Sequence, residues 1–458
     1  VTIAGDVSLS DALTTIVIEK ISSVFIAPDE EGQAYGIITE RDIMRAIEAQ
    51  GAGALEEPVT RVARLPLVSV DADEFAYRAL SLMSNEGFRH LGVLGRDGKL
   101  VGALSARDLL HQRAEDAVSL ADAIEAAADP RELGRVWSEL TAVAHALARE
   151  EVDARDIAAI ISHELRALTR RACELAEREL EQAGEGGPPV DYALLVLGSG
   201  GRGESLLAMD QDNAIIYADA GADGKADAWF EMLGTRISDI LDQVGVAYCK
   251  GGVMVSNPAW RMDLSGWRAT IGSWITRSRP EDILNSDIFF DAVPVYGNAA
   301  MAETLLAEAR GAARNAKMFL NLLALNAADY PRPATWFERL WRIDRRVDLK
   351  ANGIMPIFSA ARVAALTHGI SARATPDRLR SLSEGGIAPK KTIDNLVEAH
   401  RILLDLILRQ QLTDIDRGLP LSNKVTTGEL NGFRKKDLRW ALDQIPGIAD
   451  ILGAPLLT

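Results

Sequence analysis

The sequence predicts a multidomain protein of mixed α/β and α+β class. Three observations lead to this prediction: a length of 458 residues, an internal repeat near the N-terminus, and a glycine-rich loop between two apolar segments. A chain of this length is expected to form about three domains. The hydrophobic fraction of 48% and the charged fraction of 25% are typical of globular proteins with a sizeable core.

The repeat has an offset of 66 residues, because GIITERDIMR at 36–45 corresponds to GALSARDLLH at 102–111. A β-rich run precedes each copy, SSVFIA in the first and RHLGVL in the second, and a helical stretch lies further upstream. Each copy therefore predicts the order helix, strand, turn, strand, helix. Units of this size bury little apolar surface alone. We expect the two copies, about 1–50 and 60–113, to pack together as a pair.

The rest of the chain changes character twice. Apolar residues recur at helical spacing after the repeat, and this predicts helices up to a GEGGPP turn. An α/β segment follows, with an amphipathic helix that ends at Gly245, and then a mostly helical region. The expected helical connector, α/β domain and helical C-terminal domain are 114–185, 186–300 and 301–458. The expected strands of the α/β domain are 192–198, 212–219 and 286–298.

Composition excludes several classes of partner. Lys and Arg number 50 against 66 Asp and Glu, which gives a net charge of −16. Such a chain has no general affinity for nucleic acid or anionic membranes. No apolar run approaches the roughly 18 residues that span a bilayer. The two cysteines, Cys173 and Cys249, fit a reducing compartment, and the six histidines form no zinc motif. We therefore expect a cytoplasmic protein.

The glycine-rich segment GSGGRGESLLAMDQDNAIIYAD at 198–219 allows two interpretations. The first is a dinucleotide-binding fingerprint, since Gly198, Gly200 and Gly203 match G-x-G-x-x-G and Asp219 ends the next strand. That fold needs a full crossover helix between two parallel strands. Only ESLLAMDQ separates Gly203 from the second strand, and this is too short. An NAD-dependent dehydrogenase is therefore our third choice of function.

The second interpretation is a nucleotidyltransferase site. Asp210 and Asp212 are two residues apart at the start of a strand, so their side chains should point to the same face. Two adjacent carboxylates repel each other unless they share cations, which a two-magnesium phosphoryl-transfer site supplies. Asp291 is the candidate for a third carboxylate. The alternative is that Asp210 and Asp212 cap a turn and that Asp291 is a solvated strand end.

The loop before these carboxylates offers phosphate ligands. Backbone amides around Gly198 and Ser199, where the first strand gives way to a short helix, can surround a triphosphate. Arg202 follows within the loop and can neutralise phosphate charge.

This segment resembles the loop and metal-binding strand of the polymerase-β-like nucleotidyltransferases, in particular the GlnD-like domain related to the bacterial PII uridylyltransferase. The resemblance covers roughly 130–458 and includes CKGGVMVSNPAW, SGWRATIGSWI and NGIMPIFSAARVAALTHGI. It implies that Gly198 and Ser199 bind nucleotide phosphates and that Asp210 and Asp212 bind metal. Met209 departs from the family, which often has Thr there, and FDAVPVYG lacks an Arg expected two residues after its Asp. The chain has no His-Asp metal dyad, so no uridylyl-removing domain is expected.

The repeat resembles tandem CBS domains, modules that bind adenine nucleotides. A hydroxyl and a carboxylate three residues apart, at a strand-to-helix junction, can cap the helix. The resemblance implies that the carboxylates can instead bind ribose hydroxyls and that the arginines meet phosphates. Capping without a ligand is the alternative. The candidate adenine-nucleotide residues are Thr39, Arg41 and Asp42 in the first copy and Ser105, Arg107 and Asp108 in the second.

Together these features predict a CBS-regulated nucleotidyltransferase. It would transfer a nucleoside monophosphate from an NTP to a hydroxyl, with Mg²⁺ or Mn²⁺ on the aspartates. By analogy with PII modification the acceptor is a protein side chain, and AMP, ADP or ATP is the CBS ligand. CBS pairs often dimerise, so a homodimer is expected. The alternative is a non-catalytic signal-transduction module that senses adenine nucleotides.

Overall fold

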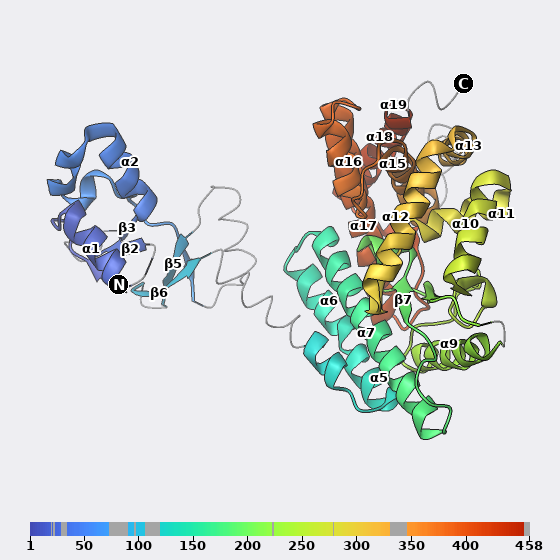
Figure 1. Ribbon diagram of the computed structural model, residues 1–458. Helices are drawn as coiled ribbons and strands as arrows, with labels where there is room; N and C mark the ends of the chain where they lie inside the picture. The colour runs from blue at the N-terminus through green and yellow to red at the C-terminus, as the bar shows by residue number, and fades with distance from the viewer. Residues whose placement is uncertain are drawn as a thin grey trace. The chain divides into compact units, whose positions relative to one another are not determined.

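The structure is a computed structural model that carries no ligands (Figure 1). It describes all residues except 20, 22, 29–33, 73–89, 96–97, 106–119, 222–223, 278, 330–345 and 453–458. The chain divides into two compact units, Val1–Asp116 and Ala117–Thr458. Each unit is described separately below.

The described residues of the first unit form two sheets of three strands with the same pairing pattern. In each sheet the first strand is parallel to the second, and the second is antiparallel to the third. The strands of the first sheet are β1 (Thr2–Ile3), β2 (Ser23–Ile26) and β3 (Gly36–Thr39). Those of the second are β4 (Ser69–Asp71), β5 (His90–Leu94) and β6 (Leu100–Ser105). The sequence repeat is therefore a structural repeat.

Helices of the first copy close its core. Leu9, Ala12 and Ile16 recur at helical spacing on α1 (Leu9–Glu19) and are buried. They pack with strand residues such as Val24 and with Ile43. The remaining described helices of this unit are α2 (Glu40–Gln50) and the 3₁₀ helices Ala52–Glu56 and Val59–Arg61.

The second unit opens with helices, as the periodicity predicts. They are α5 (Pro130–Ser138), α6 (Leu140–Arg149) and α7 (Ala154–Gln182). Asp129 starts α5 by accepting a hydrogen bond from the amide of Glu132 at 2.8 Å. Asp153 caps α7 in the same way. About half of the residues of α7 are buried, because it packs on other helices and on β7.

The sheet of the second unit has the order β10–β7–β8–β9. Its central strands are antiparallel and all their residues are buried. The antiparallel pairing excludes the parallel βαβ unit of a dinucleotide-binding fold, so the dehydrogenase interpretation is wrong. The strands are β7 (Tyr192–Val196), β8 (Asn213–Tyr217), β9 (Arg261–Asp263) and β10 (Val293–Gly297). The helices around them are α8 (Gly198–Arg202), α9 (Lys225–Gln243), α10 (Leu264–Arg277) and α11 (Pro280–Phe289).

The third expected strand, 286–298, is only partly correct. Residues up to Phe289 belong to α11, and the strand is limited to β10. Asp282 accepts a hydrogen bond from the amide of Arg279 at 3.1 Å, which supports the helix start. A short apolar run such as DIFF fits a buried helix as well as a strand, so periodicity could not separate the two.

The C-terminal region is mostly helical, as predicted. The helices are α12 (Ala299–Asn315), α13 (Lys317–Ala328), α15 (Met355–His368), α16 (Thr375–Glu384), α17 (Lys390–Asp416), α18 (Gly432–Gln444) and α19 (Ile448–Leu452). A small antiparallel pair, β11 (Arg346–Asp348) and β12 (Lys424–Thr426), and a π-helix, Lys350–Ile354, join them. Among the described residues of this unit, one hydrophobic core runs from Leu120 to Leu452. The connector, the sheet and the C-terminal helices therefore fold around shared apolar contacts.

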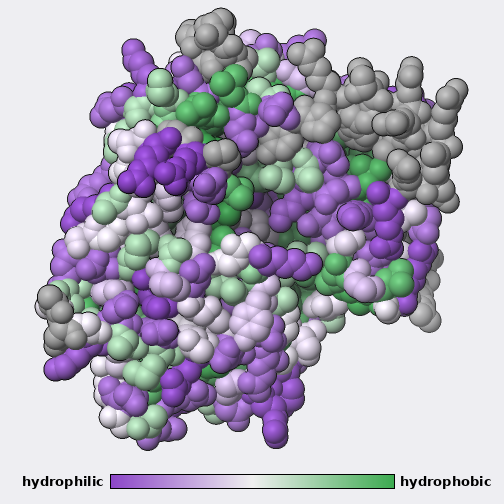
Figure 2. All heavy atoms as spheres, turned by 90° about the vertical axis from the view of Figure 1, so that its right-hand side faces the viewer, coloured by the Kyte–Doolittle hydropathy of each residue, from purple (hydrophilic) through white to green (hydrophobic). Residues whose placement is uncertain are grey.

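The surface in Figure 2 is mainly hydrophilic, with smaller hydrophobic areas between polar side chains. Among the described residues, no helix combines the length and the apolar character needed to cross a bilayer.

Candidate active site

The glycine-rich loop packs closely against two carboxylate-bearing segments. Gly198 has a φ of 52°, and a Cβ added there would lie 2.7 Å from Oδ2 of Asp212. A Cβ on Gly201 would lie 2.0 Å from the carbonyl oxygen of Asp291. Glycine is therefore required at both positions, because a side chain would push the loop away from these segments.

Asp210 and Asp212 lie on one face of an extended segment directly before β8. Asp210 forms a parallel bridge with Ala247. Between the two aspartates, the buried side-chain amide of Gln211 donates to the carbonyl oxygens of Ser238 and Val246 at 2.9 and 3.0 Å. Alternate side chains of an extended chain point to opposite sides. The two carboxylates therefore share the side away from Gln211, as the sequence predicts.

The electrostatics of this pair favour a bound cation. Burial and the nearby charge of Asp210 together raise the pKa of Asp212 to about 6, and Lys350 opposes the shift. The thiol of Cys249 donates to Oδ1 of Asp212 across 3.6 Å. Asp210 is exposed. An exposed and a partly buried carboxylate in mutual repulsion gain from a cation between them.

A small cavity of about 30 Å³ adjoins this pair on the side of Asp210. One part of its wall comes from the loop and the segment before β8, and the other from the C-terminal helices. The polar lining residues are Ser199, Arg202, Glu204, Asp210, Lys350 and Asn423. The apolar ones are Leu206, Ala208, Met209, Ile354, Phe358, Leu404 and Ile407. The Oγ atom of Ser199 is 3.1 Å from Oγ of Ser205.

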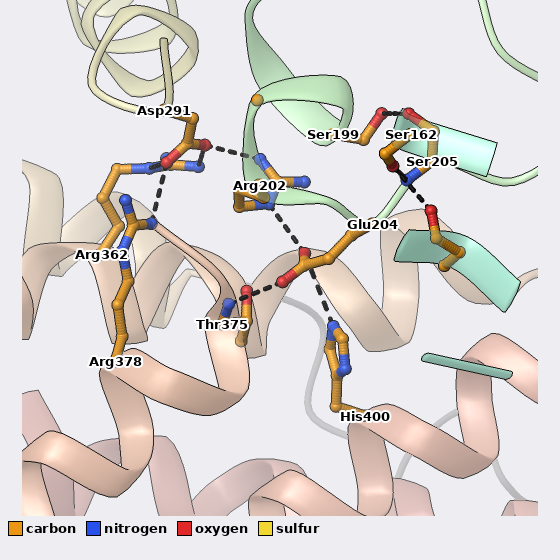
Figure 3. A network of polar contacts seen from close by, with 12 residues as sticks. Ser162, Ser199, Arg202, Glu204, Ser205, Asp291, Arg362, Thr375, Arg378 and His400 are labelled. Carbon is orange, nitrogen blue, oxygen red and sulfur yellow. Dashed lines mark hydrogen bonds and ion pairs between the residues drawn. The ribbon is translucent and has the colours of Figure 1, made fainter. Parts of the chain in front are cut away.

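Asp291, the expected third metal carboxylate, belongs to a buried ion network. It lies in the turn between α11 and β10, is fully buried, and faces arginines (Figure 3). Arg362 of α15 donates to both of its oxygens, at 3.1 and 2.6 Å, and Arg378 of α16 lies at 2.8 Å. These arginines and Arg202 hold the pKa of Asp291 down at about 2 against the effect of burial. Its carboxylate is therefore paired with arginine side chains in the core and does not line the cavity beside Asp210.

Arg202, the expected phosphate ligand, belongs to the same network and also lines the cavity. Its guanidinium donates to Asp291 at 2.6 Å and to Glu204 at 2.8 Å. Glu204 also accepts from the amide of Thr375 at 2.6 Å, and His400 lies 3.7 Å away (Figure 3). The network therefore ties the residues just after the glycine loop to α15, α16 and α17.

The aspartate pair fits magnesium with the help of a substrate. Within the part of the chain that the structure describes, no three His, Cys, Asp or Glu side chains converge as a metal site. Magnesium, however, is often held by only one or two carboxylates together with substrate phosphates. Asp210 and Asp212 supply such a partial oxygen set beside a cavity.

The CBS candidates are only partly covered by the structure. Thr39 and Asp42 form a capping box at α2, with the Thr39 hydroxyl 2.6 Å from Oδ2 of Asp42 and the Asp42 amide 3.3 Å from Oγ1 of Thr39. The capping expectation is therefore met in the first copy. Arg107 and Asp108 lie outside the described residues, as do the side chains of Arg41 and Ser105.

Sequence reasoning missed several residues of this region. Lys350 and Asn423 reach the cavity from segments far from the loop in the chain, and no local pattern marks them. Arg362 had a usable signal, because it is the one charged residue in the apolar helix MPIFSAARVAAL. A charged residue in such a helix is buried only with a partner.

Comparison with protein families now adds to this geometry. Residues 138–281 match the family "Putative nucleotidyltransferase DUF294", and residues 317–454 match "Putative nucleotidyltransferase substrate binding domain". Residues 1–49 and 59–115 each match the CBS domain. The chain is a CBS–DUF294 protein. The predicted multidomain α/β and α+β architecture is thereby confirmed. The glycine loop and the aspartate pair lie in the DUF294 domain, whereas Lys350 and Asn423 lie in its substrate-binding domain.

Individual proteins match shorter stretches of the CBS–DUF294 chain. An uncharacterized 17.7 kDa protein of Acidianus ambivalens is 33% identical over 23% of this chain and 61% of its own length. A mitochondrial CBS domain-containing protein of Arabidopsis thaliana is 29% identical over 23% of this chain and 52% of its own. The chain thus spans between half and two thirds of these two relatives.

Solved CBS structures match a quarter of the chain. A CBS-domain protein of Agrobacterium tumefaciens has 30% identity and covers 25% of this chain and 87% of its own, with a TM-score of 0.23. A CBS domain protein of Pyrobaculum aerophilum, solved in complex with AMP, has 24% identity, covers 25% and 86%, and has the same TM-score of 0.23.

Proposed function

We propose that the CBS–DUF294 chain transfers a nucleoside monophosphate from an NTP to a hydroxyl group. In this reaction the acceptor oxygen bonds to the α-phosphorus and the bond between the α- and β-phosphates breaks. Pyrophosphate leaves and the hydroxyl proton passes to water. The observation that carries the proposal is the placement of Asp210 and Asp212 on one face, beside the glycine loop and the cavity.

The residues of the chain have distinct roles in this proposal. Asp210, exposed, and Asp212, partly buried against Gly198, would hold magnesium, which orients the α-phosphate and offsets the charge that develops during transfer. Gly198 lets the loop approach the carboxylates, and Ser199 lines the cavity where phosphates enter. The apolar part of the wall excludes water from the reacting group and so limits hydrolysis.

The finer features of the proposal rest on the resemblances that the sequence shows. By resemblance to the PII uridylyltransferase, the acceptor is a protein side chain. The CBS pair binds AMP, ADP or ATP and regulates transfer, and the protein is a cytoplasmic homodimer. Neither nucleic acid nor membrane is a partner, in keeping with the net charge of −16.

One observation favours a second candidate, a non-catalytic module that senses adenine nucleotides. Asp291, the expected third carboxylate, is neutralised by three arginines. A site with two carboxylates can bind a metal–nucleotide complex without catalysing transfer. The acidic pair would then serve binding, and the helices would transmit the signal to a partner.

The test uses α-labelled ATP, UTP, GTP and CTP with magnesium and a lysate of the source cells. We expect a labelled protein band with the wild type and at least a hundredfold less label with Asp210→Asn or Asp212→Asn. Asp242→Asn, at an exposed position of α9, is the matched control and should label normally. If labelling does not depend on the aspartates while AMP still binds tightly, the non-catalytic module is the correct function.

A further inference from the structure

The cavity beside the aspartate pair is lined by two cationic side chains, Arg202 and Lys350. Arg202 is nearly buried and donates to Glu204 and Asp291. Lys350 differs, because no carboxylate among the described residues lies within ion-pair distance of its ammonium group. The cation available to a ligand in this cavity therefore comes from the C-terminal helical region, although the sequence pointed to the loop.

The chain holds Lys350 in place through its backbone. Leu349 donates its amide to the carbonyl of Asn423 at 3.1 Å. Asp348 accepts from the amide of Ala351 at 2.9 Å, and its carbonyl accepts from the side chain of Asn352 at 2.8 Å. Lys350 thus begins a π-helix whose first turn is anchored by these hydrogen bonds. Single π-turns are rare and frequently occur at functional sites.

The π-helix also packs tightly on the neighbouring helix. A Cβ on Gly353 would lie 2.9 Å from Cδ1 of Leu403 on α17, so only glycine allows this approach. The half-buried Lys350 is thereby held on the wall that also carries Asn423, and Asp210 and Ser199 complete the polar lining of the same cavity. A lysine beside two carboxylates suits a negatively charged ligand that binds together with a metal ion.

We propose that Lys350 binds the polyphosphate of the nucleotide, in the role that the sequence assigned to Arg202. A lysine ammonium is a compact charge with three donors and suits phosphate oxygens. The site is then shared between two domains: the DUF294 domain supplies the aspartates, and the substrate-binding domain supplies the cation. This inference depends on the proposed function in one respect, namely that the ligand is a nucleotide.

The test is calorimetric titration of the full chain with inorganic tripolyphosphate and magnesium. This probe lacks adenosine, so it avoids the ligand expected for the CBS pair. Lys350→Met keeps most of the apolar stem, and we expect it to weaken binding about tenfold to a hundredfold, as is typical for loss of a charged hydrogen bond. Lys350→Arg should stay within about threefold of the wild type. Lys390→Met, at an exposed lysine paired with Asp394, should not change binding.

Unfolding midpoints of all variants show whether the fold is kept, and Lys350→Gln replaces Lys350→Met if that variant is unstable. Equal affinities of wild type and folded Lys350→Met, or no binding by the wild type, would overturn the inference. The labelling assay separates it from the proposed function. Lys350-dependent binding without transfer supports the inference and rejects the transferase, whereas aspartate-dependent transfer with an unchanged nucleotide KM in Lys350→Met rejects the inference alone.

Discussion

At Gly198 the backbone of the glycine-rich loop packs directly against Asp212, one of the two candidate metal ligands. Its φ of 52° is in the left-handed region, and the position of its missing Cβ is 2.7 Å from the Asp212 carboxylate. A single methyl group at this position would affect both the backbone conformation and the Asp212 carboxylate. It would strain the backbone and displace the carboxylate or the loop, so the residue matters for the site as well as for the turn.

We expect Gly198→Ala to reduce nucleotidyl transfer at least tenfold and to destabilise the protein by about 1–2 kcal/mol. Gly272→Ala is the control, because Gly272 lies in α10 and a Cβ there meets nothing within 4 Å. That variant should be equally active and slightly more stable, since alanine favours the helix. Steady-state kinetics and urea unfolding of both variants measure these effects. Full activity of Gly198→Ala would show that Asp212 tolerates displacement.

At the scale of residues, the sequence predicts local geometry well and long-range partners poorly. The shared face of Asp210 and Asp212 follows from the alternation of side chains along a strand, and the structure agrees. The fate of Asp291 depends on Arg362 and Arg378, which are 71 and 87 residues away in the chain. No spacing rule connects such positions, so the residue was assigned by its type alone.

The elements around the loop are held by a buried ion network. Asp291, in the turn after α11, binds Arg362 of α15, Arg378 of α16 and Arg202 of α8. Arg202 also lies over the ring of Phe358, with 4.0 Å from its guanidinium carbon to the ring centre. The network fixes α8 against the C-terminal helices, so the position of the loop depends on contacts made outside the DUF294 match.

We expect Asp291→Asn to destabilise the second unit by about 3–5 kcal/mol at pH 7, because removing one member leaves buried arginine charges uncompensated. All eight tryptophans lie after residue 116, so tryptophan fluorescence during urea unfolding reports on this unit alone. Asp377→Asn, in the exposed pair with Arg380 on α16, is the control and should change stability by less than about 1 kcal/mol.

The difference in unfolding free energy between wild type and Asp291→Asn should depend on pH. The pKa of Asp291 in the fold is about 2, below the value of about 4 in an unfolded chain. Its ionised form therefore stabilises the fold fully above about pH 4, and this contribution is lost as the pH falls towards 2. The difference in unfolding free energy between wild type and Asp291→Asn should become smaller over that interval. A gap that is constant with pH would mean that the carboxylate charge does not stabilise the network.

Helices and strands were predictable where the periodic pattern of apolar residues extended over many residues or where distinctive residues flanked the segment. The 29-residue helix α7 and the buried strands β7 and β8 agree with the predicted segments. The stretch after α10 was misjudged because its apolar residues fit both a helix end and a strand. The π-helix at Lys350 could not be predicted either, since its start depends on a tertiary contact, the hydrogen bond from the Leu349 amide to the carbonyl of Asn423.

At the scale of the whole molecule, two different nucleotide-related modules are present in one chain. The repeat of the first unit and the DUF294 match of the second were both expected from short motifs, because each motif lies at a strand-to-helix junction. The arrangement of two modules in one polypeptide raises the local concentration of each near the other. Coupling between them additionally requires that a CBS ligand change the affinity of the second unit for its nucleotide.

We expect AMP to change the affinity of the full chain for magnesium–UTP by at least about fivefold, in the range of ordinary coupling energies. AMP is the suitable effector because it has no pyrophosphate to lose and cannot act as a donor. Asp42→Asn keeps a side-chain oxygen that can accept from the Thr39 amide in the capping box of α2 but loses the charge, so it should abolish the effect of AMP and leave basal transfer unchanged. Thermodynamic linkage demands that UTP change the affinity for AMP by the same factor, and titrations in both orders measure this. If AMP binds and the affinity for UTP stays the same, the two units share a chain without communicating, and regulation by the CBS pair is excluded for this ligand.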